Sequence, residues 1–148
     1  MSVYVADANF LLRLVDKPHV HHRVARAALG VLRGRGDEIV LVAQSLFEFY
    51  VVATRPGTAR GGLGLSPIDA LRWMRVFRSL FRLLPENPLF AEWERLISTY
   101  GTMGLPAHDA RYLAAIAGQK IDFILTFNSA DFNRYAPEGI TPIDPQNV

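Results

Sequence analysis

Residues 105–132 read LPAHDARYLAAIAGQKIDFILTFNSADF. In this stretch a segment with helical spacing follows Pro106, and an apolar run over residues 123–125 then ends abruptly at Thr126 and further polar residues. A short apolar run without period-two alternation is typical of a strand that is buried on both faces of a parallel sheet. The stretch therefore predicts a helix followed by a buried strand, which delivers polar side chains to one edge of the sheet.

The rest of the chain repeats this alternation of short apolar runs and amphipathic segments. Strands are expected at residues 3–6, 39–42, 83–84, 123–126 and 140–143, the last at a sheet edge because Pro142 interrupts it. Helices are expected at residues 9–15, 19–32, 44–54, 67–81, 89–100 and 107–118. The pattern predicts an α/β fold with a mainly parallel central sheet of about four or five strands, covered on both faces. The length predicts a single domain over residues 1–148.

The composition excludes several classes of protein. The chain has no cysteine, which excludes a disulfide scaffold, an iron–sulfur cluster and a thiol nucleophile, and which favours a reducing compartment. No apolar run approaches the roughly 20 residues of a membrane span, and the first ten residues lack the pattern of a signal peptide. We therefore expect a cytoplasmic protein with no membrane partner.

Arginine dominates the positive charge of the chain. Lys17 and Lys120 are the only lysines among its 16 basic residues. The guanidinium group binds phosphate bidentately and also suits ion pairs, while the base composition of a genome could produce the same bias. The bias alone leaves phosphate binding open.

Four acidic residues stand where an α/β sheet binds its ligands. Asp7 follows the first expected strand, Asp131 follows a later one, and Asp109 falls in the first turn of its helix. Glu48 lies within SLFEFYVV, where a carboxylate among apolar neighbours needs a cation or hydrogen bonds. Each acid also has a simpler interpretation: an N-cap for Asp7, a first-turn acid for Asp109, a turn residue for Asp131 and a structural ion pair for Glu48.

Taken together, the four acids predict a cation site. Carboxylates brought together hold either protons or a cation at neutral pH, and oxygen ligands without cysteine suit Mg²⁺ or Mn²⁺. Removing these four from the 14 acidic residues leaves 10 against 16 basic ones. A metal-filled cluster would therefore leave a basic surface that suits a polyanion.

Four motifs carry a resemblance to a known family. They are VADANFLL with Asp7, SLFEFYVVATRP with Glu48, LPAHDARYLAA with Asp109, and ILTFNSADF with Asn128 and Asp131. In this order and spacing the chain resembles the PIN-domain ribonucleases, and among them the VapC-type toxins of toxin–antitoxin pairs. The resemblance implies a three-layer α/β/α fold, a Mg²⁺ or Mn²⁺ site at the four acids, and hydrolytic cleavage of single-stranded or looped RNA, often tRNA or rRNA. It also implies a homodimer and a small antitoxin protein that fills the active-site groove.

The site residues receive roles from this resemblance. Asp7 and Asp109 would ligate the metal that carries the attacking water, and Asp131 would ligate a second ion or position the first through water. Glu48 would be a ligand or the general base. Asn128 would orient a carboxylate or the scissile phosphate. Ala8 departs from the family, which more often has a hydroxyl residue there, and Thr126 is a candidate to support the ligands.

Other polar residues are candidates for contact with substrate. Arg55 and Arg60, in or beside an expected mobile glycine-rich loop at residues 56–64, could bind phosphate, the alternative being a solvated loop. His108 could touch substrate because it precedes Asp109. His19, His21 and His22 are expected at the surface. The expected helix 67–81 and its end carry an arginine face, Arg72, Arg75 and Arg82, which could bind RNA, an antitoxin or only water.

Two rival functions remain open. An Asp-based phosphotransferase also places an aspartate after its first strand. One such class, the haloacid-dehalogenase type, usually has a second Asp two residues later, where this chain has Asn9. Another, the receiver type, needs a lysine near its last strands, whereas Lys120 precedes its strand. A catalytically silent module that binds RNA or protein is the other alternative. The presence of all four acids argues against such loss of activity.

Overall fold

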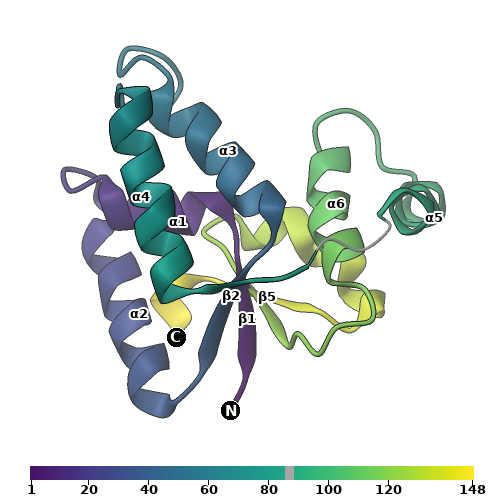
Figure 1. The fold of residues 1–148 in the computed structure, drawn as a ribbon. Helices are drawn as coiled ribbons and strands as arrows, with labels where there is room; N and C mark the ends of the chain where they lie inside the picture. Colours follow the sequence, from purple (N-terminus) through teal and green to yellow (C-terminus); the bar gives the residue numbers. More distant parts are fainter. Residues whose placement is uncertain (86–88) are drawn as a thin grey trace.

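The computed structural model describes residues 1–85 and 89–148, and in these residues five strands form one parallel sheet. The strand order is β3-β2-β1-β4-β5. Figure 1 shows the course of the chain through the sheet and its helices. The strands are β1 (Val3–Ala6), β2 (Glu38–Leu41), β3 (Arg82–Leu83), β4 (Phe123–Leu125) and β5 (Thr141–Ile143). All neighbouring pairs are parallel, as the sequence predicted.

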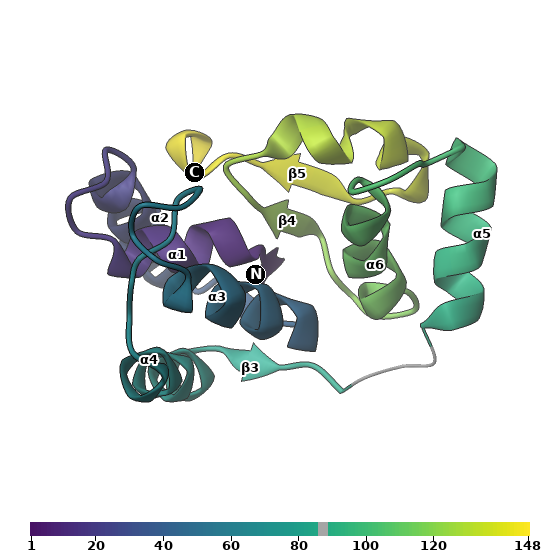
Figure 2. The same ribbon diagram turned by 90° about the horizontal axis from the view of Figure 1, so that it is seen from above.

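Helices cover both faces of this sheet, which confirms the predicted three-layer α/β/α fold. They are α1 (Ala8–Val15), α2 (His22–Arg35), α3 (Ala43–Thr54), α4 (Pro67–Leu80), α5 (Phe90–Tyr100) and α6 (Ala107–Ile116), with the 3₁₀ segments η1 (Ser129–Glu138) and η2 (Pro145–Asn147). Seen from above, α1 to α4 lie on one side of the sheet and α5, α6 and η1 on the other (Figure 2).

The central strand shows why its apolar run lacks a polar face. Tyr4 and Ala6 pack into the core beneath α1 to α4, whereas Val5 between them packs into the second core beneath α5 and α6. Successive side chains of a strand point to opposite faces, so a strand covered on both sides must be apolar at every position. β1 is therefore apolar throughout, and the polar residue Asp7 follows directly after its last residue, Ala6.

The sheet edges and two helix ends refine the predictions. Pro142 lies in β5, an edge strand, where its missing N–H costs no ladder bond to a further strand. α2 begins at His22, three residues later than expected, after a turn in which the His22 N–H donates to the carbonyl of His19. α4 begins as predicted, with the Ser66 hydroxyl accepting from the Asp69 N–H, but it ends at Leu80.

The predicted arginine face is wrong as a single helical surface. Arg82 lies beyond α4, in β3, and its guanidinium forms a two-bond ion pair with Glu38 of β2 at 2.7 and 3.0 Å. Arg72 pairs instead with Asp69 on its own helix, at 3.1 Å. No helix in the described ranges is both long and apolar enough to cross a membrane.

Candidate active site

Asp7 stands at the carboxyl end of the central strand. Its N–H donates to the carbonyl of Leu125 at 3.0 Å, which continues the pairing of β1 with β4 by one residue. Asp7 occupies the N-cap position of α1, yet its side chain makes no capping bond to the described chain. Helix capping therefore does not explain why an acidic residue stands here. Asp7 is also buried, with only 8% of its surface exposed.

The carboxylate of Asp7 is held by side chains from two elements. Its Oδ2 accepts a hydrogen bond from Thr126 Oγ1 at 2.7 Å and another from Asn9 Nδ2 at 3.0 Å. Thr126 is fully buried and its hydroxyl also accepts from Asn9 Nδ2 and from the N–H of Asn128, both at 3.0 Å. Asn9 Oδ1 in turn accepts the N–H of Phe127. The start of α1 and the end of β4 thus form one network around a single oxygen.

Glu48, on α3, is held at both of its oxygens. Gln44 Nε2, one turn earlier, donates to Oε1 at 2.7 Å, and the hydroxyl of Tyr112 on α6 donates to Oε2 at 3.1 Å. Each of these two side chains also forms a hydrogen bond with the backbone of a residue next to another acid, His108 beside Asp109 or Ala8 beside Asp7. Gln44 Nε2 donates to the carbonyl of His108 at 2.8 Å, and the Tyr112 oxygen accepts the N–H of Ala8 at 3.3 Å.

This arrangement couples three acid-bearing segments through two buried side chains. Gln44 ties the carboxylate of Glu48 to the turn of α6 that carries Asp109, and Tyr112 ties it to the turn after Asp7. Burial raises the pKa of the Tyr112 hydroxyl well above 10, with the charges of Asp7 and Glu48 acting in the same direction. Tyr112 therefore keeps its proton and remains a donor.

The four acids lie close enough for the charges of three of them to act on the fourth, Asp109. Burial and, after it, the negative charges of Asp131, Asp7 and Glu48 together raise the pKa of Asp109 to about 7, against the opposing charge of Arg134. The pKa of Asp7 is raised to about 6, chiefly by burial and also by the charge of Glu48, while the Thr126 hydrogen bond lowers it in part. Ionised carboxylates in this state repel one another, and a cation would relieve the repulsion.

Asp131 and Asn128 lie at the exposed rim of the site. Both belong to the segment that follows β4, where the N–H of Asp131 donates to the carbonyl of Asn128 at 3.0 Å as η1 begins. Asp131 is exposed, and its negative charge contributes to the raised pKa of Asp109. The side chain of Asn128 is also exposed, while its backbone is anchored on the Thr126 hydroxyl.

The residues proposed for substrate contact separate in the structure. A groove of about 430 Å³ lies between α3 and α6, beside Glu48. This α3–α6 groove is lined by Gln44, Phe47, Glu48, Val51, Val52, Arg55, His108 and Arg111. Arg55 and His108 therefore border it, and Thr126 sits beneath the Asp7 carboxylate rather than on any exposed surface. Arg60 lies on the outer turn of the glycine-rich loop, where its carbonyl accepts a bond from Arg55 Nη1 at 3.1 Å.

The loop that carries Arg60 folds back on α3. The N–H of Gly64 donates to the carbonyl of Arg55 at 2.8 Å, and the N–H of Leu65 donates to the carbonyl of Ala53 at 2.9 Å. Gly62 approaches so closely that a Cβ there would collide with the backbone of Pro56. Residues 56–64 thus form hydrogen-bonded turns against the helix end.

By their chemistry these residues fit a divalent cation. All four acids offer hard oxygen ligands, and two carry the raised pKa values that mutual repulsion and burial produce in carboxylates. In the ranges 1–85 and 89–148, no three acidic or histidine side chains surround one point closely enough to enclose an ion. Ion binding would therefore draw the carboxylates together.

Sequence reasoning missed four polar residues of the site. Gln44 and Tyr112 stand one helical turn from Glu48 and Asp109, respectively, and Asn9 stands two residues after Asp7. Their spacing from the assigned acids was the available signal. Arg134 acts on Asp109 from η1, a segment that the sequence pattern did not predict to be helical.

Comparisons with known proteins agree with the fold described above. The family model described as "PIN domain" matches residues 4–137. VapBC2 from Rickettsia felis, solved with a DNA fragment from its promoter, superposes with a TM-score of 0.64 at 11% identity, covering 96% of this chain and 98% of that one. FitAB bound to a DNA fragment gives a TM-score of 0.68 at 16% identity, with 98% and 96% covered. VapC20 from Mycobacterium tuberculosis, described as a sarcin–ricin loop cleaving toxin, gives 0.62 at 16% identity, with 92% and 95% covered. No protein with a curated description matches the sequence significantly.

Proposed function

We propose that this chain, which belongs to the PIN domain family, is a metal-dependent endoribonuclease and the toxin of a toxin–antitoxin pair. The observation that carries the proposal is the polar network at the carboxyl edge of the sheet. Tyr112 joins Glu48 to the residue after Asp7, Gln44 joins Glu48 to the turn that bears Asp109, and Thr126 holds the Asp7 carboxylate. Buried carboxylates that repel one another destabilise the fold, so their presence argues against a chain that has lost its activity.

Mg²⁺ or Mn²⁺ held by Asp7, Glu48, Asp109 and Asp131 would supply a Lewis acid that favours deprotonation of water and neutralises phosphate charge. The chain's own groups perform the remaining tasks. Thr126 and Asn9 fix the Asp7 carboxylate. Gln44 and Tyr112 orient Glu48, whose carboxylate retains free lone pairs with which it would either bind the ion or take the proton of the attacking water. Asn128, which is exposed at the rim, would orient a carboxylate or the scissile phosphate.

The proposed reaction balances as a hydrolysis of one phosphodiester bond. Water oxygen forms a bond to phosphorus, the bond from phosphorus to the ribose 3′ oxygen breaks, and that oxygen takes a proton. The products carry a 3′-hydroxyl and a 5′-phosphate. The substrate we propose is RNA, such as tRNA or rRNA, and Arg55 and His108 are the substrate contacts that the α3–α6 groove supports best.

The proposed partners follow from the resemblance to toxin–antitoxin complexes. VapBC2 and FitAB are solved with DNA. For this chain we propose an antitoxin protein that covers the active site, a homodimeric assembly, and a single catalytic domain over residues 1–148.

The decisive experiment is incubation of purified total tRNA and rRNA with the antitoxin-free chain in Mn²⁺, Mg²⁺ or EDTA. Wild type is compared with Asp109→Asn, and the new RNA ends are mapped. Discrete metal-dependent cuts that carry 5′-phosphates and vanish in the variant support the proposal. Cuts that survive the substitution, or the absence of cuts in every metal, refute it.

A further inference from the structure

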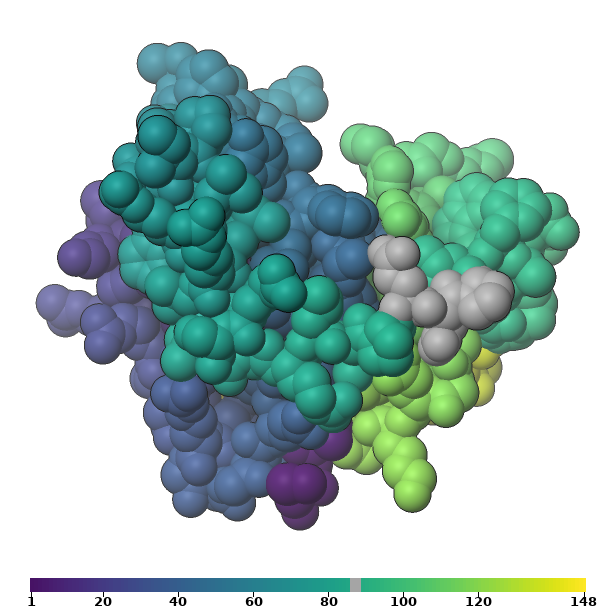
Figure 3. All heavy atoms as spheres, viewed as in Figure 1, coloured from purple at the N-terminus to yellow at the C-terminus, as the bar shows by residue number. Residues whose placement is uncertain are grey.

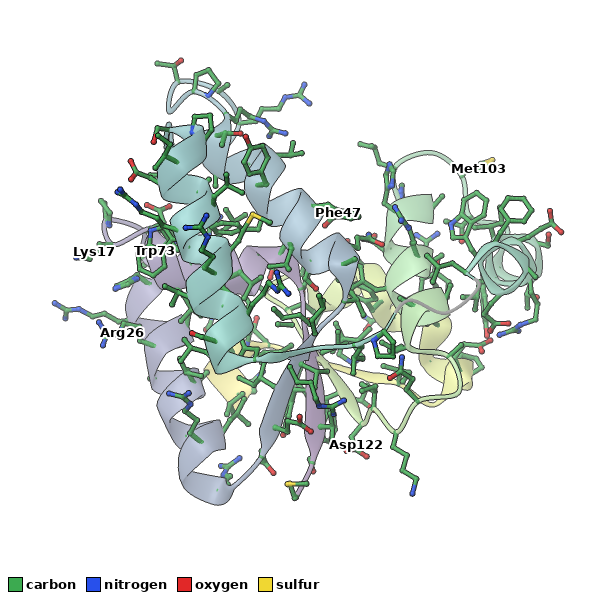
Figure 4. The ribbon with its side chains drawn as sticks, in the orientation of Figure 1. Lys17, Arg26, Phe47, Trp73, Met103 and Asp122 are labelled. Atoms are coloured by element: carbon green, nitrogen blue, oxygen red, sulfur yellow. The ribbon has the colours of Figure 1, made fainter. Side chains whose placement is uncertain are left out.

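The α3–α6 groove has one apolar wall that the protein core does not use. Phe47 is 54% exposed and Val51, one helical turn later, is 55% exposed, so both project from the same face of α3. The opposite face of this helix already packs into the core through Leu46, Phe49 and Ala53. Phe47 lies on the side of α3 that faces α6 (Figure 4), and the surface is hollowed between these elements (Figure 3).

The groove also carries positive charge. Arg55 lies at the end of α3 and Arg111 on α6, and within the described residues neither forms an ion pair with a carboxylate. One guanidinium nitrogen of Arg55, Nη1, donates to the Arg60 carbonyl at 3.1 Å, which leaves its other N–H groups available. Guanidinium groups match phosphate oxygens bidentately.

A groove that is lined by an exposed aromatic ring and two arginines favours one kind of ligand. Unpaired nucleic acid binds by stacking its bases on aromatic side chains while cationic groups follow its phosphates. A base within a duplex is stacked on its neighbours and cannot use such a ring without being unstacked. The groove opens directly at Glu48, so a phosphate at the acid cluster would place the adjoining nucleotide over Phe47.

We infer that the α3–α6 groove is the subsite for the unpaired nucleotide next to the scissile phosphate. The base of this nucleotide stacks on Phe47 and contacts Val51, while Arg111 and Arg55 bind the flanking phosphates. This inference rests on the proposed function, and what it adds is the assignment of Phe47, Val51, Arg55 and Arg111 as the side chains that contact this nucleotide.

The test measures binding without cleavage. A short fluorescein-labelled RNA of mixed, unpaired sequence is titrated with the full chain in EDTA, and fluorescence anisotropy gives the Kd. Phe47→Ala is expected to weaken binding about 10-fold, since a single base stack on an aromatic side chain is commonly worth that much. Phe47→Trp should retain the affinity, because indole also stacks. Arg111→Ala should weaken binding and lower the slope of log Kd against log salt by about 0.7.

Matched controls come from α4, which does not border the groove. Ile68 is an exposed apolar residue and Arg75 an exposed arginine there, so Ile68→Ala and Arg75→Ala should leave the Kd nearly unchanged. A duplex of the same sequence should bind independently of Phe47. Moving an abasic nucleotide along the RNA should find one position where wild type loses affinity and Phe47→Ala does not.

Three outcomes would overturn the inference. Unchanged RNA binding by Phe47→Ala would show that the groove serves another ligand, such as a protein partner. Equal losses in Phe47→Ala and Ile68→Ala would show a general surface effect. A Phe47 effect that persists on fully abasic RNA would exclude base stacking. Cleavage of RNA is measured separately from binding. If binding depends on the base and on Phe47 but no RNA is cut, only the proposed function is refuted. If RNA is cut but the Kd does not depend on Phe47, only the subsite is refuted.

Discussion

Replacing Asp109 with asparagine is expected to stabilise the metal-free protein at pH 8. The Asp109 carboxyl makes no side-chain hydrogen bond with the described residues, so the substitution removes a charge and breaks no bond there. Burial and the neighbouring acids raise its pKa from 3.8 to about 7 in the folded chain. Asparagine is a neutral isostere of the protonated acid, and it removes the cost of ionising this group in place.

The sign of the pH dependence follows from the raised pKa. Between pH 4 and 7 the folded protein retains a proton on Asp109 that the unfolded chain has already released, so stability falls as pH rises through this window. A rise of roughly three pKa units corresponds to about 4 kcal/mol at most. Partial exposure of the carboxyl screens its charge, so we expect a gain of about 1–3 kcal/mol for Asp109→Asn at pH 8, and almost none near pH 4.

The assay is chemical unfolding of both proteins in EDTA, followed by circular dichroism at several pH values. Glu94→Gln removes an exposed acid of α5 outside the site and should change the free energy of unfolding by less than about 0.5 kcal/mol. Adding Mn²⁺ at about 100 times its Kd should then stabilise wild type by roughly 2.7 kcal/mol and the Asp109 variant by less. A variant that is less stable than wild type at pH 8, or a difference that does not grow between pH 4 and 8, would show that Asp109 is not under charge repulsion.

Three further substitutions test the supporting contacts. Thr126→Val should lower the free energy of unfolding, measured with urea, by about 1–3 kcal/mol, because Asp7 Oδ2 loses its shortest hydrogen bond. Thr126→Ser keeps the hydroxyl and should recover most of this loss. Tyr112→Phe removes the hydrogen bond to one oxygen of Glu48, so it should lower the affinity for Mn²⁺ in calorimetric titrations and lower the free energy of unfolding by only about 1 kcal/mol. Unchanged Mn²⁺ affinity would argue against a positioning role for Tyr112. Phe49→Ala, at a fully buried position of α3, should cost about 3–5 kcal/mol, and a smaller loss in thermal unfolding would contradict the packing described for that helix.

Local pattern in the sequence was enough to predict the layers of the fold and the positions of the acids. Strands buried on both faces must be apolar throughout, so β1 and β4 were visible as short runs, and Pro142 correctly marked an edge. Asp7 was visible as a candidate because it ends such a run. The roles of the acids remain predictions, which the experiments above test.

The tertiary structure alone decided which distant groups meet. Thr126 bonds to Asp7 across 119 positions and Tyr112 to Glu48 across 64, and no local pattern contains such pairings. The ion pair of Arg82 with Glu38 depends in the same way on strand pairing, which removed Arg82 from the helical face that its spacing suggested. Propensity and periodicity act over a few residues, whereas the hydrogen bonds that hold the site are set by how parallel strands align their carboxyl ends.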